Sequence, residues 1–104
     1  MNAPVHHAQM SRAAPKAILI RWWQGGKVAP LDCTTFSCAV LETTLPFVPV
    51  IAPHDLAQGW FRIVPPAPNL AAELIVGQRY PLHVVLRNAL GEAIEDMTFA
   101  LEVV

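Results

Sequence analysis

Apolar and polar side chains alternate along much of this chain, with the period of two that β-strands produce. Residues 80–87 alternate most clearly, because Tyr, Leu, Val and Leu occupy every second position. Residues 94–104 alternate in the same way and place these apolar side chains on one face: Met97, Phe99, Leu101 and Val103. A turn at residues 88–91 separates the two runs. We therefore predict two neighbouring strands joined as a hairpin.

Further strands are predicted between corners rich in glycine and proline: residues 16–23, 33–43, 47–52 and 60–64. The third of these carries proline, which lacks an amide hydrogen, so we expect it at the edge of a sheet. Asn69 is expected to cap one helical turn over residues 70–75, which is too short to connect parallel strands. The whole pattern predicts an all-β fold: an antiparallel Ig-like β-sandwich of about seven strands with one short helical turn.

Residues 1–15 show neither the period of strands nor that of helices, and consist largely of alanine, proline and polar residues. Such a segment buries too little apolar surface to offset the entropy of ordering it. We therefore divide the chain into a flexible, extended N-terminal arm, residues 1–15, and a β-sandwich domain, residues 16–104. The arm is open to two interpretations: a frayed terminus, or a segment that orders on a neighbouring subunit as an added strand.

Adjacent apolar residues interrupt the alternation at residues 22–23, 84–85 and 103–104. An antiparallel sheet with one solvated face should alternate cleanly, so loops or another chain are expected to cover the second face. The composition agrees, because 54% of the residues are hydrophobic and only 14% are charged. Apolar surface left outside the core usually marks a contact with another molecule.

The charges of the chain argue against two classes of partner. Its seven Lys and Arg residues are scattered among eight acidic ones, for a net charge of −1, whereas nucleic-acid binding needs clustered cations. Charged residues interrupt every apolar run before it reaches the length of a transmembrane helix. The first residues lack a signal-peptide pattern, so we expect synthesis in a cytoplasm, with no nucleic acid and no membrane as partner.

Cysteine and histidine residues give little indication of a metal or redox site. Cys33 and Cys38, if both lie on one strand, are roughly 16 Å apart, and a disulfide tolerates at most about 7 Å between Cα atoms. We interpret both as buried thiols. His6 and His7 point in opposite directions in an extended arm, and zinc needs three or four converging ligands. A metal- or thiol-handling protein stays a third possibility, but no metal and no cofactor are predicted.

No residue pattern predicts catalysis. His54 and Asp55 follow a proline in a predicted turn, where turn chemistry accounts for the aspartate. The acidic residues Glu92, Glu95 and Asp96 surround a predicted hairpin end, and nothing predicts a cleft between them. Neither serine lies in a nucleophile elbow. We therefore expect no enzymatic activity and no catalytic residue.

The adjacent Trp22 and Trp23 face opposite sides of a strand, so at most one of them lies in the core. The other belongs to a protein interface, where tryptophan is enriched, or to a sugar-stacking platform. A carbohydrate- or surface-binding module is therefore the alternative function. The candidate interface residues come from the arm, the first strand and the proline-flanked strand: Pro4, Val5, Met10, Trp22, Trp23, Phe47 and Val48.

From residue 22 onward, the order of turns and strands resembles small β-sandwich domains of phage virion proteins. The segments that carry the resemblance are Trp22–Gly26, Pro30–Thr34, Gly59–Pro65, Gly77–Tyr80, the hairpin around Gly91, and Leu101–Val103. The spacing from Gly77 to Tyr80 is one residue longer than in those domains, and the N-terminal arm is additional.

The resemblance implies a location in the virion, as in baseplate adaptor domains or capsid decoration proteins. It implies a non-enzymatic structural protein that acts through subunit docking. Its expected partners are the protein subunits of a larger assembly, either copies of itself in a homo-oligomer or neighbouring virion proteins.

Overall fold

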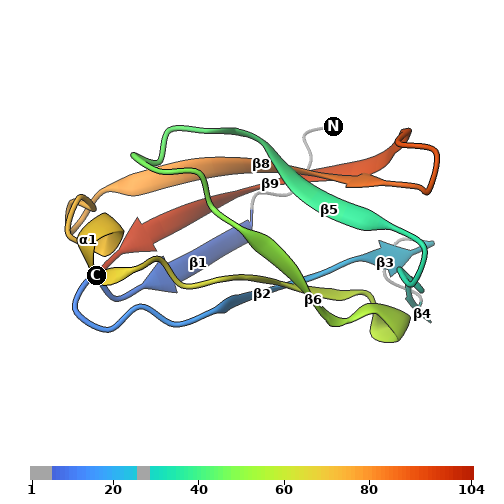
Figure 1. Cartoon of the computed structure of the whole chain (residues 1–104), viewed down its shortest axis with the longest axis horizontal. Coiled ribbons are helices and arrows are strands. Elements are labelled where there is room, and N and C mark those ends of the chain that lie inside the picture. The colour runs from blue at the N-terminus through green and yellow to red at the C-terminus, as the bar shows by residue number, and fades with distance from the viewer. Residues whose placement is uncertain (1–5, 26–28) are drawn as a thin grey trace.

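The computed structural model describes residues 6–25 and 29–104, and this part of the chain is mostly β-strand (Figure 1). One sheet has four strands in the order β1 (His6–Met10), β9 (Ala93–Val103), β8 (Arg79–Arg87) and β5 (Ser37–Thr43). A second has three, in the order β2 (Ile18–Arg21), β7 (Trp60–Ile63) and β6 (Ile51–Asp55). The short strands β3 (Trp23–Gln24) and β4 (Ala29–Pro30) pair separately.

The two larger sheets share one hydrophobic core, to which each of their strands contributes side chains. The predicted apolar face of β8 is confirmed, because all its members are buried: Tyr80, Leu82, Val84 and Leu86. From the predicted face of β9, Phe99, Leu101 and Val103 are buried and Met97 packs beside them. The three-stranded sheet contributes Ile20, Phe61 and Ile63 to the same core. Period-two patterning thus identified the core faces correctly.

The strand β6 differs in position from its prediction but lies at a sheet edge, as expected. It covers Ile51–Asp55, whereas the sequence predicted residues 47–52. Its register is set by a row of apolar residues on the inner face, in which Ile51 and Ile18 both pair with Ile63 of β7. The preceding segment carries Pro46 and Pro49, which have no amide hydrogen to extend the ladder.

The second predicted strand begins later than expected, because its first residues form a turn. The Asp32 carboxylate accepts hydrogen bonds from the Thr34 backbone N–H at 3.0 Å and from the Thr34 hydroxyl at 2.8 Å. The Phe36 N–H then bonds to the Cys33 carbonyl oxygen at 2.9 Å. Short polar side chains compete with strand pairing in this way. Cys33 therefore lies outside β5, and both cysteines are free and buried, as predicted.

The N-terminal segment differs most from its prediction. Instead of a flexible arm, His6–Met10 forms β1, which pairs in parallel with β9 of the same chain. The Met10 side chain is 3% exposed and joins the core. Beyond β1, the Arg12 N–H bonds to the Val104 carbonyl oxygen at 3.0 Å. The free edge of β9 supplies the pairing that a segment of this composition lacks by itself.

The link between β7 and β8 contains the α-helical turn α1 (Pro68–Ala71), slightly earlier than the predicted residues 70–75. Ala67, rather than Asn69, is the N-cap residue, and Pro68 occupies the first turn, where its missing N–H costs nothing. The Tyr80 hydroxyl, at the start of β8, accepts a hydrogen bond from the Ile75 N–H at 3.2 Å. This bond closes the corner between α1 and β8.

Candidate functional site

The structure divides the predicted interface residues between the core and the surface. Met10 is 3% exposed and Trp22 is 1% exposed, so both belong to the core and neither offers a surface for docking. Pro4 and Val5 lie outside the described residues. Trp22 turns inward because it continues the inner face of β2 beyond Ile20. As predicted, only one of the adjacent tryptophans is in the core, since Trp23 keeps part of its surface exposed.

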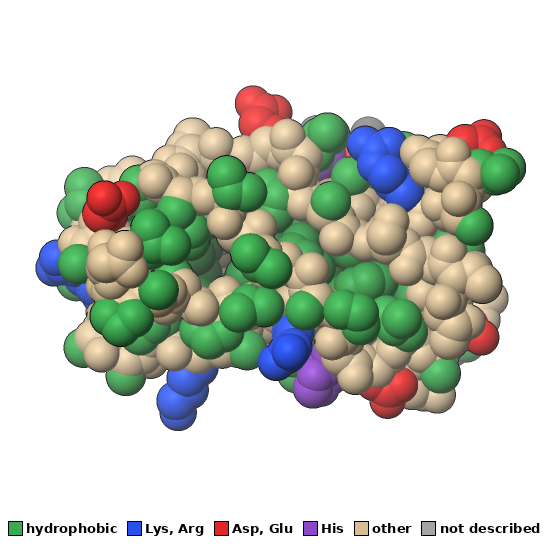
Figure 2. Space-filling model, viewed as in Figure 1, with side chains coloured by type: hydrophobic (Ala, Val, Ile, Leu, Met, Phe, Trp, Pro, Cys, Tyr) green, Lys and Arg blue, Asp and Glu red, His purple; other side chains and the backbone are tan. Residues whose placement is uncertain are grey.

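Val48 is 85% exposed, in the segment that links β5 to β6. The neighbouring Phe47 is half-buried and packs against the core. Two further apolar side chains of the same region face solvent: Leu41 is 56% exposed and Val50 is 61% exposed. Figure 2 shows hydrophobic side chains gathered on this side of the molecule. We refer to Leu41, Val48 and Val50 as the β5–β6 edge.

The backbone of the β5–β6 edge is poorly suited to accept an added strand. The pairing of β5 with β8 shifts register between Val40 and Glu42, which is the signature of a bulge. The strand β6 contains Pro53 and also shifts register between Pro53 and Asp55. Bulges and prolines are features that protect edge strands from pairing with other chains. Contact with another molecule at this edge therefore depends on its exposed apolar side chains.

A second surface feature lies on the outer face of the three-stranded sheet. The Arg21 guanidinium carbon is 4.4 Å from the centroid of the Trp23 ring and 4.8 Å from that of the Trp60 ring. The sheet register explains this arrangement, because Arg21 pairs directly with Trp60 and precedes Trp23 by two residues. The Arg21 Nε also donates a hydrogen bond to the Gln58 carbonyl oxygen at 3.0 Å. We refer to Arg21, Trp23 and Trp60 as the tryptophan–arginine cluster.

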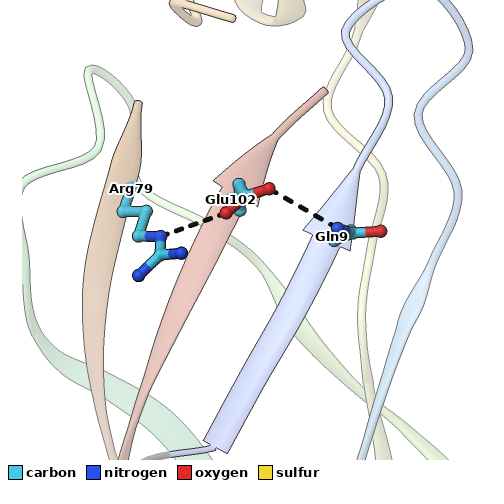
Figure 3. Close-up of polar contacts among 3 residues, drawn as sticks. All are labelled: Gln9, Arg79 and Glu102. Atoms are coloured by element: carbon cyan, nitrogen blue, oxygen red, sulfur yellow. Dashed lines mark hydrogen bonds and ion pairs between the residues drawn. The ribbon is translucent and has the colours of Figure 1, made fainter. Parts of the chain in front are cut away.

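The outer face of the four-stranded sheet is polar. The Arg79 Nε donates to Glu102 at 3.0 Å, and Gln9 of β1 makes a longer contact of 3.5 Å with the same carboxylate (Figure 3). His83 and Asp96 form a second pair at 2.6 Å. The expected apolar second face is therefore not found on this sheet. Val85 is an apolar residue on this otherwise polar face, and its side chain is only 4% exposed. It pairs with Ala39 of β5 on one side and with Asp96 of β9 on the other.

The cysteines are placed where thiols are unreactive. Burial raises the pKa of Cys33 to about 11 and that of Cys38 to about 11, so both stay protonated near neutral pH. The buried Trp22 indole nitrogen has no hydrogen-bond partner within the described part of the chain. The Cys38 sulfur beside this nitrogen is a weak acceptor. Its contact with Trp22 lowers the pKa of Cys38, but by less than burial raises it.

The remaining polar candidates do not converge on one site. His54 and Asp55 are exposed in β6, and Glu92, Glu95 and Asp96 are exposed at the end of the β8–β9 hairpin. In residues 6–25 and 29–104, no three potential metal-ligating side chains come together. A shallow depression lies beside α1, where the Arg12 Nη2 donates to the Ala72 carbonyl oxygen at 2.6 Å.

Comparisons with known proteins do not identify the chain: no family model, curated protein or solved structure matches it. The described residues also include no helix with the length and hydropathy needed to cross a bilayer.

Sequence reasoning did not single out three of the surface residues described above: Arg21, Leu41 and Val50. Trp60 and Arg21 lie almost forty positions apart, and only the register of β2 with β7 makes them neighbours. The spacing of Arg21 and Trp23, two residues apart on one strand, was a detectable part of this signal. Leu41 is the exposed, unpaired residue at the bulge between Val40 and Glu42, and bulges leave no simple mark in an alternating pattern.

Proposed function

We propose that this protein is a non-enzymatic structural component of a phage virion, which acts by docking onto neighbouring protein subunits. The observation that carries the proposal is the exposed β5–β6 edge. Its three apolar side chains are each more than half exposed, at 56%, 85% and 61%. Exposed apolar side chains that gather in one region are the usual mark of a protein contact.

The proposal includes an Ig-like β-sandwich, and the strand order supports it. The observations that support this topology are two sheets with the orders β1-β9-β8-β5 and β2-β7-β6, and a first strand that pairs in parallel with the last. The bond from the Ile75 N–H to the Tyr80 hydroxyl supports it as well. A tyrosine near the start of the corresponding strand, bonded to backbone a few residues upstream, is a hallmark of this architecture.

The assignment to a phage virion is supported by the sequence resemblance. The segments that carry it fall at structural corners: Gly59 precedes β7 with φ of 79°, and Gly91 lies in the β8–β9 turn with φ of 81°. Such domains join virion proteins by packing against them, which suits a domain whose described residues gather no catalytic group.

A carbohydrate- or surface-binding module is the second candidate, favoured by the partly exposed rings of Trp23 and Trp60. The Arg21 guanidinium lies over both rings, so it competes with a sugar for the ring faces on which the sugar stacks. Trp22, one of the two platform residues that the sequence suggested, is buried. Binding of the protein to a glycan array, lost in a folded Trp23→Ala variant, is the result that favours this candidate.

The proposed function is tested on particles. Virions from the source of the chain are separated on a density gradient, and each fraction is probed with an antibody raised against the purified protein. We expect the protein in the particle band, at a fixed ratio to the major coat protein. Its presence only in the soluble fractions contradicts the proposed function.

A further inference from the structure

The cations on the outer face of the three-stranded sheet make no ion pair with any described residue. Arg21 and Arg62 both lie on this face, because Arg62 follows Trp60 by two residues in β7. The ion pairs between described residues join Arg79 to Glu102 and His83 to Asp96, so neither involves these two arginines. Asp55 pairs with Trp60 across the sheet but makes no ion pair within the same set of residues. This face is therefore basic and aromatic.

The tryptophan–arginine cluster holds its guanidinium in a fixed position. Two indole rings lie 4.4 and 4.8 Å from the Arg21 guanidinium carbon, and the bond from Nε to Gln58 fixes its direction. The Arg21 terminal nitrogens make no hydrogen bond to any other described residue. A planar guanidinium with free terminal N–H groups binds a carboxylate through two parallel hydrogen bonds. Holding the side chain in advance lowers the entropy that such binding costs.

The chain itself presents a complementary surface at the end of the β8–β9 hairpin. Leu90 is 84% exposed there, two residues before the exposed Glu92, whose carboxylate makes a long contact of 3.5 Å with the Asn88 Nδ2. The turn is well ordered, because the Asn88 side-chain oxygen accepts hydrogen bonds from the N–H groups of Leu90 and Glu92, each at 3.0 Å. Arg87 adds a bond to the Gly91 carbonyl oxygen at 3.1 Å. This surface is complementary to the tryptophan–arginine cluster, because a leucine can pack against tryptophan rings and a carboxylate can pair with a guanidinium.

We propose that the tryptophan–arginine cluster binds the β8–β9 hairpin end of a second copy of this chain. The Glu92 carboxylate of one copy pairs with Arg21 of the other, and Leu90 packs against the parts of the Trp23 and Trp60 rings that stay exposed beside Arg21. Tryptophan and arginine are the residues most enriched at the energetic centres of protein interfaces. This inference rests on the docking function proposed above. It adds to that function by naming a second copy of the chain as one partner.

The position of the two features allows the contact to form twice. In Figure 1, the end of the β8–β9 hairpin and the short strands β3 and β4 lie at the same end of the molecule. Trp23 belongs to β3, so the tryptophan–arginine cluster lies near the same end of the molecule as the hairpin end. In two copies related by a two-fold axis, the hairpin end of each copy can therefore bind the tryptophan–arginine cluster of the other. Two such contacts close the assembly as a dimer.

Charge reversal tests the pairing in the full chain. We expect the wild-type protein to form a dimer in sedimentation equilibrium, and Glu92→Arg to raise the dissociation constant on the order of tenfold or more. Glu73→Arg makes the same charge change at another exposed position and should leave the dimer unchanged. Because Arg21→Glu also removes the cation–π contacts, its circular dichroism and melting temperature are compared with those of the wild type.

Mixing gives the sharper result. Arg21→Glu and Glu92→Arg should each be monomeric alone but dimerise when mixed, because both contacts of the mixed pair then join opposite charges. A wild-type chain that stays monomeric at every concentration overturns the inference, as does Glu92→Arg behaving like Glu73→Arg. Retention of that monomer on heparin would assign the basic face to an anionic polymer instead. The dimerisation measurement needs no virus particle. Failure of this inference is therefore distinguishable from failure of the proposed function, which is absence of the protein from virions.

Discussion

At the scale of single residues, Gly59 is a position where a side chain meets the backbone of two neighbouring segments. Its φ is 79°, and a Cβ there would lie 2.5 Å from the Trp22 carbonyl oxygen and 2.8 Å from that of Leu31. Gly59→Ala should therefore destabilise the fold by more than about 2 kcal/mol, since steric overlap with backbone adds to the strain of positive φ. Urea unfolding measures the change.

Gly91→Ala is the matched control, because Gly91 has a similar φ of 81° but nothing within 4 Å of the added Cβ. It should cost only the conformational strain, roughly 1 kcal/mol. Equal losses of stability in the two variants would show that the close approach at Gly59 is not structurally important.

The buried thiols predict a pH dependence of stability. Burial raises the pKa of Cys33 and of Cys38 from 9.0 to about 11 in the folded state, so the folded protein binds more protons than the unfolded chain between these values. Their contribution is complete below pH 9 and is lost as pH rises through about 11. The free energy of unfolding should fall across this range, and more steeply than in a Cys33→Ala/Cys38→Ala variant. Parallel curves for the two proteins contradict the assignment.

The sequence predicted residue environments well where alternation alone decides them. Tyr80, Val84 and Leu86 were placed in the core because a strand has only two faces. The contact of Arg21 with Trp60 could not be predicted, because it depends on which strands pair and in which register. The prediction of interface residues was wrong where partners distant in sequence decide burial, as for Met10, which pairs with Val103.

At the scale of elements, β1 separates the structure from the sequence prediction most clearly. If β1 is an integral strand, Met10→Ala should destabilise the protein by about 2–5 kcal/mol, because it empties a buried site. The adjacent Gln9 is exposed, so Gln9→Ala should change stability by no more than about 0.5 kcal/mol. Denaturant unfolding of the two variants measures both effects. A neutral Met10→Ala would restore the interpretation of this segment as a flexible arm.

The arm was not recognised as a strand because its own composition gives no strand signal. Residues 6–10 contain no β-branched or aromatic residue, and their pairing is supplied by β9, more than ninety positions later. The β8–β9 hairpin was predicted correctly, since its strands alternate and a short turn containing Asn88 and Gly91 joins them. Elements specified by local pattern were therefore found, and elements specified by a distant neighbour were not.

At the scale of the whole molecule, the two larger faces differ. The four-stranded sheet exposes the ion pair of Arg79 with Glu102, which at the surface contributes at most about 1 kcal/mol, and the polar contact of His83 with Asp96; both suit contact with water. The three-stranded sheet exposes the tryptophan–arginine cluster, and the β5–β6 edge exposes apolar side chains. A subunit with two such surfaces can bind a second copy and a different neighbour at once. This division of surfaces follows from the fold and was outside the reach of the sequence pattern.

The claim that the β5–β6 edge docks onto a neighbouring virion subunit is tested by the incorporation of the protein into particles. The amount of protein per particle is measured by quantitative mass spectrometry for the wild type, for Val48→Asp and for Thr35→Asp, an exposed control in the turn before β5. Val48 is 85% exposed, so neither change should lower folding stability by more than about 0.5 kcal/mol. We predict that Val48→Asp lowers incorporation on the order of tenfold, while Thr35→Asp matches the wild type. Equal incorporation of all three proteins, or no wild-type protein in the particle, contradicts the claim.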